Sequence, residues 1–481
     1  MDTKEKDLRV EIVKLREKLL FSEGQFFYVI FHHLKKNIAV SDRITPPSPS
    51  PKSSKKQEYE GLTEYKNKLL RITHSPFMML IWAVTALRTL IFFIPDKARE
   101  YKLYREFIGF KESNFADVIN FGVIPYNFRK LRQQHLVEKL AIIGHRIFYI
   151  ENRFKVADKP GFSVYKKKKN IYIVKLHCQR DIAIYHQIPT AKEIKFINAS
   201  LDKLMLYARI NNPVAKIDYP FWAYLQDHLL MPLIYDCMDD YEGFDITGKH
   251  ILQLEKGLVK KADLTLVCSN ILMSKILKLK PIRSVLIKNA GDYEHFAAAE
   301  KITCKIPSDL PTKKRKIIGF FGAVGEWIDA VLLREIAERY KDMGIVIIGQ
   351  IQNKEITALQ NLPNMWFLGE KPYNKLPDYL QWFDVCIIPF KISRHTTLID
   401  PVKLYEYFAS GKPVVTTAVA EIKHFKNLLY YSDSRKKFLD NVQTALQEKN
   451  SGLRKKRQEA AKNNTWDKRA KLLHAWIQKL T

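Results

Sequence analysis

Cysteine is scarce and scattered in this 481-residue chain. Its five cysteines form no Cys-x-x-Cys pair and no Cys/His cluster at metal-ligand spacing. This spacing argues against a zinc-built or disulfide-built scaffold and favours a reduced, cytoplasmic chain without a metal site. The N-terminus also lacks the apolar core of a secretory signal. Instead, Leu8, Ile12, Leu15 and Leu19 step by four, three and four, which predicts a helical or coiled-coil segment over 1–40, suited to self-association, or a plain amphipathic helix.

Two common phosphate-binding fingerprints are missing. The chain has neither Gly-x-Gly-x-x-Gly nor Gly-x-x-x-x-Gly-Lys-Ser/Thr, and "GFFGAVG" instead spaces Gly319, Gly322 and Gly325 three apart. The next predicted strand ends at Gly349 and Gln350, without the acidic residue that binds an NAD ribose. These absences count against a nicotinamide-dependent enzyme and against a P-loop protein that binds a nucleoside triphosphate.

Positive charge, by contrast, is abundant. Lys and Arg total 80 against 51 Asp and Glu, a formal charge of +29, which favours an anionic partner such as phosphates, nucleic acid or an acidic membrane surface. Nucleic acid is not the expected partner, because no recognition helix or aromatic-studded basic strand accompanies the charge. The local basic runs at 166–169, 313–316 and 454–457 are expected to be solvated loops.

One long apolar run lies near the N-terminus. Residues 41–60 are rich in Pro, Ser and Lys and predict a disordered linker, and 61–112 then carries "PFMMLIWAVTALRTLIFFIP" at 76–95. Arg88 inside this run costs roughly 3 kcal/mol in a bilayer centre, so insertion is marginal. We expect a membrane-associated helix with Trp82 and Arg88 at headgroup level, the alternative being a helix packed on the catalytic body.

From residue 113 onward, short apolar runs alternate with helical patterns. "ADVINFGV", "HRIFYIEN", "MPLIYDCMDD" and "DLTLVCS" are typical of strands, and after a linker at 301–316 the pattern repeats in "KIIGFFG", "GIVIIGQ", "NMWFLGE", "DVCIIPF" and "KPVVTT". The sequence therefore predicts an α/β protein with two doubly wound Rossmann-like domains, over 113–300 and 301–465. A ligand cleft is expected between them, at the carboxyl ends of the strands.

The stretch "PVKLYEYFASGKPVV" at 401–415 predicts a helix followed by a sharp turn and a buried strand. Asp400 is expected to cap the helix and Pro401 to occupy its first position. Lys403 and Glu406 then lie near one helix edge, close to an N-terminus whose free amides attract anions. A cation, free N–H groups and a carboxylate suit a phosphate-bearing sugar.

These motifs carry a family resemblance. "DPVKLYEYFASGKPVV" together with "LGEKPYNKLPDYLQWFDVCIIPF" resembles the donor half of bacterial surface-polysaccharide glycosyltransferases of the family 4 kind, which have the GT-B fold. "FGVIPYNFRKLRQQHL", "YDCMDDYEGF" and "FFGAVGEWID" extend the resemblance over roughly residues 113–480. Residues 466–481 resemble the last helix of this fold, which crosses back to the first domain.

The resemblance implies transfer of a sugar from a UDP- or GDP-sugar to an acceptor hydroxyl in a cell-surface polysaccharide or lipid-linked glycan. It also implies retention at the anomeric carbon and no required metal or cofactor, and the sequence agrees in having no Asp-x-Asp motif. Glu406 would bind the ribose hydroxyls, while Lys403 and Arg394 would offset the charge of the leaving group. The implied donor-binding set is Gly322, Ala323, Lys371, Tyr373, Arg394, Thr397, Lys403 and Glu406.

On the acceptor side, three aspartates follow a predicted strand of the first domain. Asp236, Asp239 or Asp240 could orient or deprotonate the acceptor hydroxyl, with Asp239 and Asp240 joining Lys403 as catalytic candidates; alternatively, they cap the following turn. Arg132 and His135 in "LRQQH" are candidates to contact phosphate, or they sit on a helix face.

One position departs from the family pattern. Leu398 stands where family 4 enzymes often carry a second glutamate, eight positions before Glu406. This leaves open a non-catalytic GT-B scaffold that binds nucleotide sugar or glycan without turnover. The expected location is cytoplasmic, peripheral at the inner face of the plasma membrane, with an anionic membrane surface and a glycan or lipid-linked acceptor as partners.

Overall fold

The computed structural model describes residues 115–481 apart from 211, 244–247, 301–304 and 312–314, and it leaves the side chains of Arg394 and His395 undescribed. The segments predicted at 1–40, 41–60 and 61–112, including the apolar run at 76–95, lie outside the described residues. Within the part of the chain that is described, no helix is long and apolar enough to cross a membrane.

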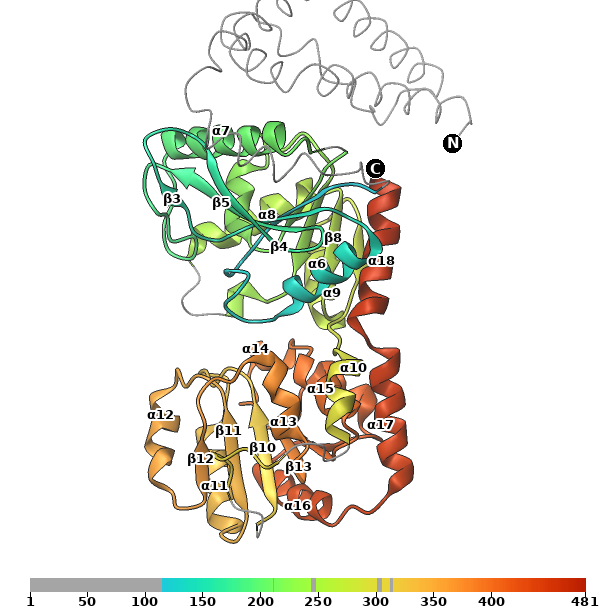
Figure 1. Ribbon diagram of the computed structural model, residues 1–481. Helices are drawn as coiled ribbons and strands as arrows, with labels where there is room; N and C mark the ends of the chain where they lie inside the picture. The colour runs from blue at the N-terminus through green and yellow to red at the C-terminus, as the bar shows by residue number, and fades with distance from the viewer. Residues whose placement is uncertain (1–114, 211, 244–247, 301–304, 312–314) are drawn as a thin grey trace, which may run out of the picture. The chain divides into compact units, whose positions relative to one another are not determined.

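The first domain is built on a mostly parallel sheet (Figure 1). Its strand order is β3-β5-β2-β1-β6-β7-β8-β9, and β4 pairs antiparallel with β5. The strands are β1 (Val118–Phe121), β2 (Ile147–Ile150), β3 (Lys155–Val156), β4 (Phe162–Lys168), β5 (Ile171–Cys178), β6 (Val214–Ile217), β7 (Leu233–Cys237), β8 (Leu264–Val267) and β9 (Ser284–Leu286). The helices are α6 (Arg132–Ile143), α7 (Ala191–Tyr207), α8 (Lys249–Lys261) and α9 (Asn270–Lys278), with short 3-10 turns η2 (Pro220–Leu225) and η3 (Tyr241–Gly243).

The second domain has its own parallel sheet, in the order β12-β11-β10-β13-β14-β15. The strands are β10 (Ile317–Phe321), β11 (Gly344–Ile348), β12 (Met365–Phe367), β13 (Val385–Ile388), β14 (Val414–Thr417) and β15 (Tyr430–Ser432). The helices are α10 (Tyr293–Ala297), α11 (Ala330–Arg339), α12 (Lys354–Thr357), α13 (Leu376–Leu380), α14 (Arg394–Thr397), α15 (Val402–Ala409), α16 (Arg435–Leu446) and α17 (Ser451–Asn463), with 3-10 turns η4 (Ala298–Glu300), η5 (Ala358–Asn361), η6 (Tyr373–Lys375) and η7 (Ala420–Phe425). The prediction of two Rossmann-like α/β domains is confirmed.

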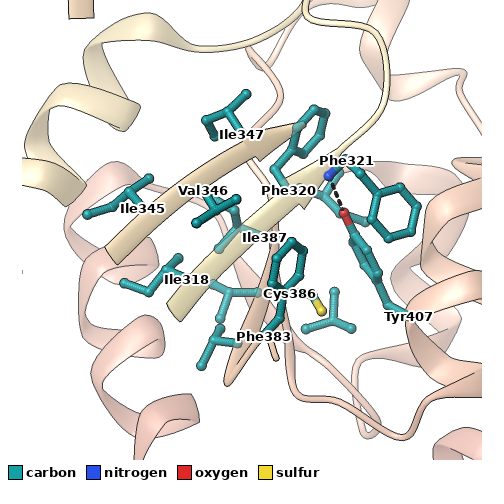
Figure 2. Close-up of a cluster of buried hydrophobic side chains, with 14 of the residues drawn as sticks. Ile318, Phe320, Phe321, Ile345, Val346, Ile347, Phe383, Cys386, Ile387 and Tyr407 are labelled. Atoms are coloured by element: carbon teal, nitrogen blue, oxygen red, sulfur yellow. Dashed lines mark hydrogen bonds between the residues drawn. The ribbon is translucent and has the colours of Figure 1, made fainter. Parts of the chain in front are cut away.

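The core of the second domain fixes the position of α15. The central strands are buried on both faces, so they are almost continuously apolar (Figure 2). Gly319 leaves room for the ring of Phe383, whose atoms would lie 2.1–2.3 Å from any Cβ at that position. The Phe321 N–H donates to the Tyr407 hydroxyl at 3.0 Å, and the two rings pack edge to face. This bond ties α15 to the end of β10.

The chain passes between the two domains twice, once between β9 and α10 and once between α17 and α18, and these two segments are hydrogen-bonded to each other. The Gly291 N–H donates to the Asn464 carbonyl at 3.1 Å, and the Trp466 N–H donates to the Gly291 carbonyl at 3.4 Å. Beyond this point α18 (Trp466–Leu480) packs along α6, and Trp466 belongs to the core of the first domain (Figure 1). In the other direction α10 packs with α15 and Phe296 joins the second core, although α10 precedes the boundary expected after residue 300.

Candidate active site

The beginning of α15 is held by tertiary contacts rather than by a local cap. Pro401 is the N-cap and makes no side-chain cap bond. The carboxylate of Asp400 instead accepts from the Asn289 N–H and from the Tyr405 hydroxyl, both at 2.8 Å. The prediction that Asp400 caps the helix was therefore wrong, because both carboxylate oxygens are already occupied. One accepts from the backbone of Asn289, between β9 and α10, and the other accepts from the buried Tyr405 hydroxyl. Burial raises the pKa of Asp400 to about 6.

Glu406 and Lys403 lie about one turn apart on α15, and the charge of each shifts the pKa of the other. Glu406 is only 5 % exposed, and burial raises the pKa of its carboxyl to about 8, with Asp292 adding to the rise and Lys403 opposing it. Burial lowers the pKa of the half-buried Lys403 ammonium to about 8, and Glu406 opposes that fall. Both groups therefore change charge near the same pH. A nearby phosphate would favour the charged lysine.

The glycine loop after β10 meets this lysine directly. Gly322 has a positive φ of 133°, and a Cβ at this position would lie 3.0 Å from Cε and 3.3 Å from Nζ of Lys403. The lysine Nζ also lies 5.1 Å from the ring centre of Phe320 and 5.0 Å from that of Phe390. The structure thus brings Gly322, and Ala323 next to it in the chain, to the cationic end of α15.

Tyr373 supplies an aromatic wall beside Glu406. Its ring stacks on His295 at 4.8 Å between ring centres, and the Lys130 Nζ lies 5.0 Å from its centre. The hydroxyl is buried and makes no hydrogen bond of normal geometry among the described residues. Burial and the charge of Glu406 raise the pKa of Tyr373. The buried Tyr373 hydroxyl and the desolvated Glu406 carboxyl interact with each other, and together they mark a place where a polar ligand would be favoured.

Other predicted donor residues have partners of their own. The Lys371 Nζ forms an ion pair with Asp309 at 2.8 Å. Thr397 ends α14, and its N–H donates to the Ser393 carbonyl at 3.1 Å, so this amide is used within the helix. Arg394 begins α14, but its side chain lies outside the described part.

In the first domain, Arg132 and Asp236 lie inside a buried ion network rather than on a surface. Arg132 binds Asp236 through Nε at 3.0 Å and Nη2 at 2.9 Å, and the Lys216 Nζ binds Asp236 at 2.9 Å. Lys216 also pairs with Asp218, which accepts from Asn120 at 2.7 Å. Burial pushes the pKa of Asp236 up, but Arg132 and Lys216 outweigh it and hold the pKa low. These groups are engaged with one another, which suits a structural role.

The other two aspartates differ from Asp236 and from each other. Asp240 is buried and pairs with Lys275. Asp239 keeps access to solvent and makes no side-chain hydrogen bond or ion pair within the described residues. The protein that surrounds it still desolvates its carboxyl in part and raises the pKa to about 6, with Asp240 adding to the rise. Asp239 is therefore the best placed of the three to exchange a proton near neutral pH.

His135 is a packing residue in this structure. It is 1 % exposed and stacks on Trp466 with 4.9 Å between ring centres and 8° between planes. Neither ring nitrogen has a partner among the described residues. Burial lowers the pKa of His135 well below its usual value, so the ring is neutral. Its ring joins α6 to α18 and does not lie on an exposed helix face.

The comparisons with known proteins agree with this geometry. Residues 315–448 match the model of the family described as Glycosyl transferases group 1. This segment, most of the second domain, is therefore similar to group 1 glycosyltransferases. A proposed teichuronic acid biosynthesis glycosyltransferase of Bacillus subtilis (strain 168), TuaH, is 28 % identical over 201 residues, which is 38 % of this chain and 50 % of that protein. The chain thus spans about half the length of this curated relative.

Solved structures match over both domains. Sucrose-phosphate synthase from Thermosynechococcus elongatus aligns with 76 % of this chain and 99 % of its own, at a TM-score of 0.59 and 15 % identity. Anabaena Alr3699/HepE, solved in complex with UDP and glucose, aligns with 76 % of this chain and 100 % of its own, at a TM-score of 0.55 and 13 % identity. The chain has the GT-B fold.

In this GT-B protein the sequence did not reveal Asn289. Its Oδ1 accepts from Arg132 Nη1 at 3.2 Å, and its Nδ2 donates to the Asp400 carbonyl at 2.7 Å. Asn289 therefore links the buried ion network of the first domain to the start of α15. No motif marks it, because its role depends on residues more than a hundred positions away in both directions.

Gly291 was missed for the same reason. A Cβ there would lie 3.0 Å from Tyr405 Cβ and 3.3 Å from the Glu406 nitrogen. The segment that connects the two GT-B domains thus lies directly against the part of α15 that carries Glu406. Among the described residues, no cluster of three or more His, Cys, Asp or Glu side chains is arranged to hold a metal ion.

Proposed function

We propose that this protein transfers a sugar from a nucleotide-diphosphate sugar to an acceptor hydroxyl during synthesis of a cell-surface polysaccharide or lipid-linked glycan. The observation that carries the proposal is the convergence of Glu406, Lys403 and Gly322: a desolvated carboxyl, a half-buried cation and a close backbone approach at one helix end. The family match of residues 315–448 and the name of the Bacillus relative support glycosyl transfer, and the UDP in the HepE structure supports a nucleotide-diphosphate sugar as the donor.

Each group has a role in the transfer. Glu406 accepts hydrogen bonds from the ribose hydroxyls, and Lys403 faces the diphosphate with the backbone of Gly322 and Ala323. As the bond between the anomeric carbon and the diphosphate oxygen breaks, its electron pair stays on the nucleotide diphosphate, whose added charge Lys403 offsets. The acceptor oxygen bonds to the anomeric carbon, and its proton passes to a base, for which Asp239 is the candidate. We further propose retention at the anomeric carbon and no metal requirement.

Donor binding is tested by calorimetry with UDP and GDP. Glu406→Ala removes the hydrogen bonds to the two ribose hydroxyls, worth about 1 kcal/mol each and about 2 kcal/mol together, so Kd should rise roughly thirty-fold. Glu338→Ala, at an exposed glutamate of α11, is the matched control and should leave Kd unchanged. Equal affinity of wild type and Glu406→Ala for both nucleotides would refute the donor site.

A non-catalytic scaffold is the second candidate, because the partly exposed Leu398 replaces a glutamate common in the family. Radiolabelled UDP- and GDP-sugars distinguish the two. Transfer or hydrolysis of any donor supports the enzyme, whereas nucleotide binding with no turnover across a panel of donors and glycan acceptors supports the scaffold.

We also propose a peripheral location at the inner face of the plasma membrane, carried by the apolar run at 76–95, and self-association through residues 1–40. The membrane contact is tested by flotation of the full chain with vesicles containing phosphatidylglycerol. Trp82→Glu should reduce flotation, and unchanged flotation would exclude this segment as the contact.

A further inference from the structure

The basic run at 166–169 belongs to a β-hairpin, contrary to the expectation of a solvated loop. Lys166, Lys167 and Lys168 end β4, and the chain turns through Asn170, which has a positive φ of 63°, into β5 (Figure 1). The side chains from 165 to 169 are all exposed. A run of lysines on an outer strand discourages pairing with other strands, but it also creates a concentrated positive surface.

A bulge in the hairpin aligns two side chains of β4. Tyr165 pairs with Ile173 and Lys168 pairs with Ile171, with the register shifting between Lys166 and Lys168. Since Ile171 and Ile173 are two residues apart, they point to the same face of the sheet, where they pack in the core beneath α6. Tyr165 and Lys168 therefore share the α6 face despite being three residues apart.

Contacts on that face join the hairpin to the loop before α6. The Asn127 Nδ2 donates to the Tyr165 hydroxyl at 2.8 Å, and the Lys168 Nζ binds Glu138 at 2.6 Å. The Lys130 Nζ binds the same glutamate at 3.1 Å. Glu138 thus holds two lysines from separate segments close together.

The loop adds exposed aromatic surface and reaches the donor site. Phe128 is 52 % exposed, with the Arg129 guanidinium 4.6 Å from its ring centre, and Tyr165 is 44 % exposed. Exposed rings of this size offer flat faces for the apolar side of sugar rings. At the other end, Lys130 lies over the ring of Tyr373, which borders Glu406.

We propose that this surface, the acceptor platform formed by Phe128, Lys130, Tyr165 and the lysines at 166–169, binds a glycan acceptor that carries carboxylates or phosphates. The aromatic rings contact the sugar rings, and the lysines contact the acidic groups. This inference rests on the proposed function, because the platform leads to the donor site from the first domain. It adds the acceptor's chemical class, an anionic glycan chain long enough to reach beyond the reacting sugar.

The test measures binding of a fluorescent oligogalacturonide, a carboxylate-bearing glycan, to the full chain at low ionic strength. Lys167→Glu/Lys169→Glu should raise its Kd roughly five-fold or more, because two attractions become repulsions. Phe128→Ala should weaken binding of the same probe without changing the net charge. Lys455→Glu/Lys456→Glu, at exposed lysines of α17, makes the same change in net charge away from the platform and should have little effect. The carboxyl-reduced probe should bind weakly to every variant.

Three results would overturn the proposal. One is equal Kd for wild type and the hairpin variant, and another is equal loss in the hairpin and α17 variants, which would show attraction to net charge alone. The third is a hairpin variant that loses binding to phosphatidylglycerol vesicles but keeps oligogalacturonide binding, which would assign the lysines to a membrane. Titrations of the same variants with UDP and GDP test the donor site independently of the acceptor platform. If the variants bind nucleotide as tightly as wild type, the proposed function stands even where the glycan measurements reject the acceptor platform.

Discussion

The titration of the α15 pair gives a prediction for the free protein that needs no substrate. In the unfolded chain Glu406 loses its proton near pH 4.5, whereas burial in the folded protein raises its pKa to about 8. The folded state therefore binds more protons between these values, and the free energy of unfolding falls as pH rises from about 4.5 to about 8. The full difference corresponds to about 5 kcal/mol at 1.36 kcal/mol for each pH unit.

Lys403 acts in the opposite direction at higher pH. Its folded pKa of about 8 lies below the ordinary value of 10.5, so the unfolded state binds more protons between them and stability rises with pH in that window. The two effects together predict a stability minimum near pH 8 in the absence of nucleotide. Glu406→Gln should remove the fall on the acid side, and Lys403→Met should remove the rise on the alkaline side.

The assay is urea unfolding of the wild type and both variants from pH 5 to pH 10, followed by circular dichroism. Because two domains need not unfold together, the quantity compared is the difference in midpoint between each variant and wild type at each pH. Glu338→Gln on α11, an exposed site, controls for the general effect of removing a glutamate. If Glu406→Gln and wild type show parallel pH profiles, the carboxyl is not desolvated as described and the reasoning fails.

Three further predictions concern the surrounding groups. Arg132→Met should destabilise the protein by about 3–5 kcal/mol, because it leaves the buried Asp236 without its bidentate partner; thermal unfolding checks this, and a loss below about 1 kcal/mol would contradict it. Gly291→Ala should weaken UDP binding several-fold while the fold is retained, because its Cβ would press on Tyr405 at 3.0 Å; calorimetry with unchanged Kd would argue against this coupling. Asp239→Asn should lower kcat roughly 10²- to 10⁴-fold and abolish the rise in activity as pH increases through about 6, whereas an unaltered pH–rate profile would exclude it as the base.

Strand positions in the second domain followed from the sequence with little ambiguity. "KIIGFFG", "GIVIIGQ", "NMWFLGE", "DVCIIPF" and "KPVVTT" contain β10 to β14 in order. Parallel strands covered on both faces are continuous apolar runs, so burial leaves its mark directly on the local sequence. The β4 strand was missed for the converse reason. It is exposed, ends in lysines and contains a bulge, so neither an apolar run nor strict alternation identifies it.

Sequence by itself determined that Lys403 and Glu406 share one short helix that begins at a proline and ends in a turn before a buried strand, because helix spacing and turn chemistry are local. Tertiary structure decided what the polar groups do: Asp236 is held in an ion network, His135 is neutral beneath Trp466, and Asp400 is an anchor rather than a cap. Desolvation and hydrogen-bond partners come from segments distant along the chain. A residue's charge state and availability are therefore set only once those segments have packed together.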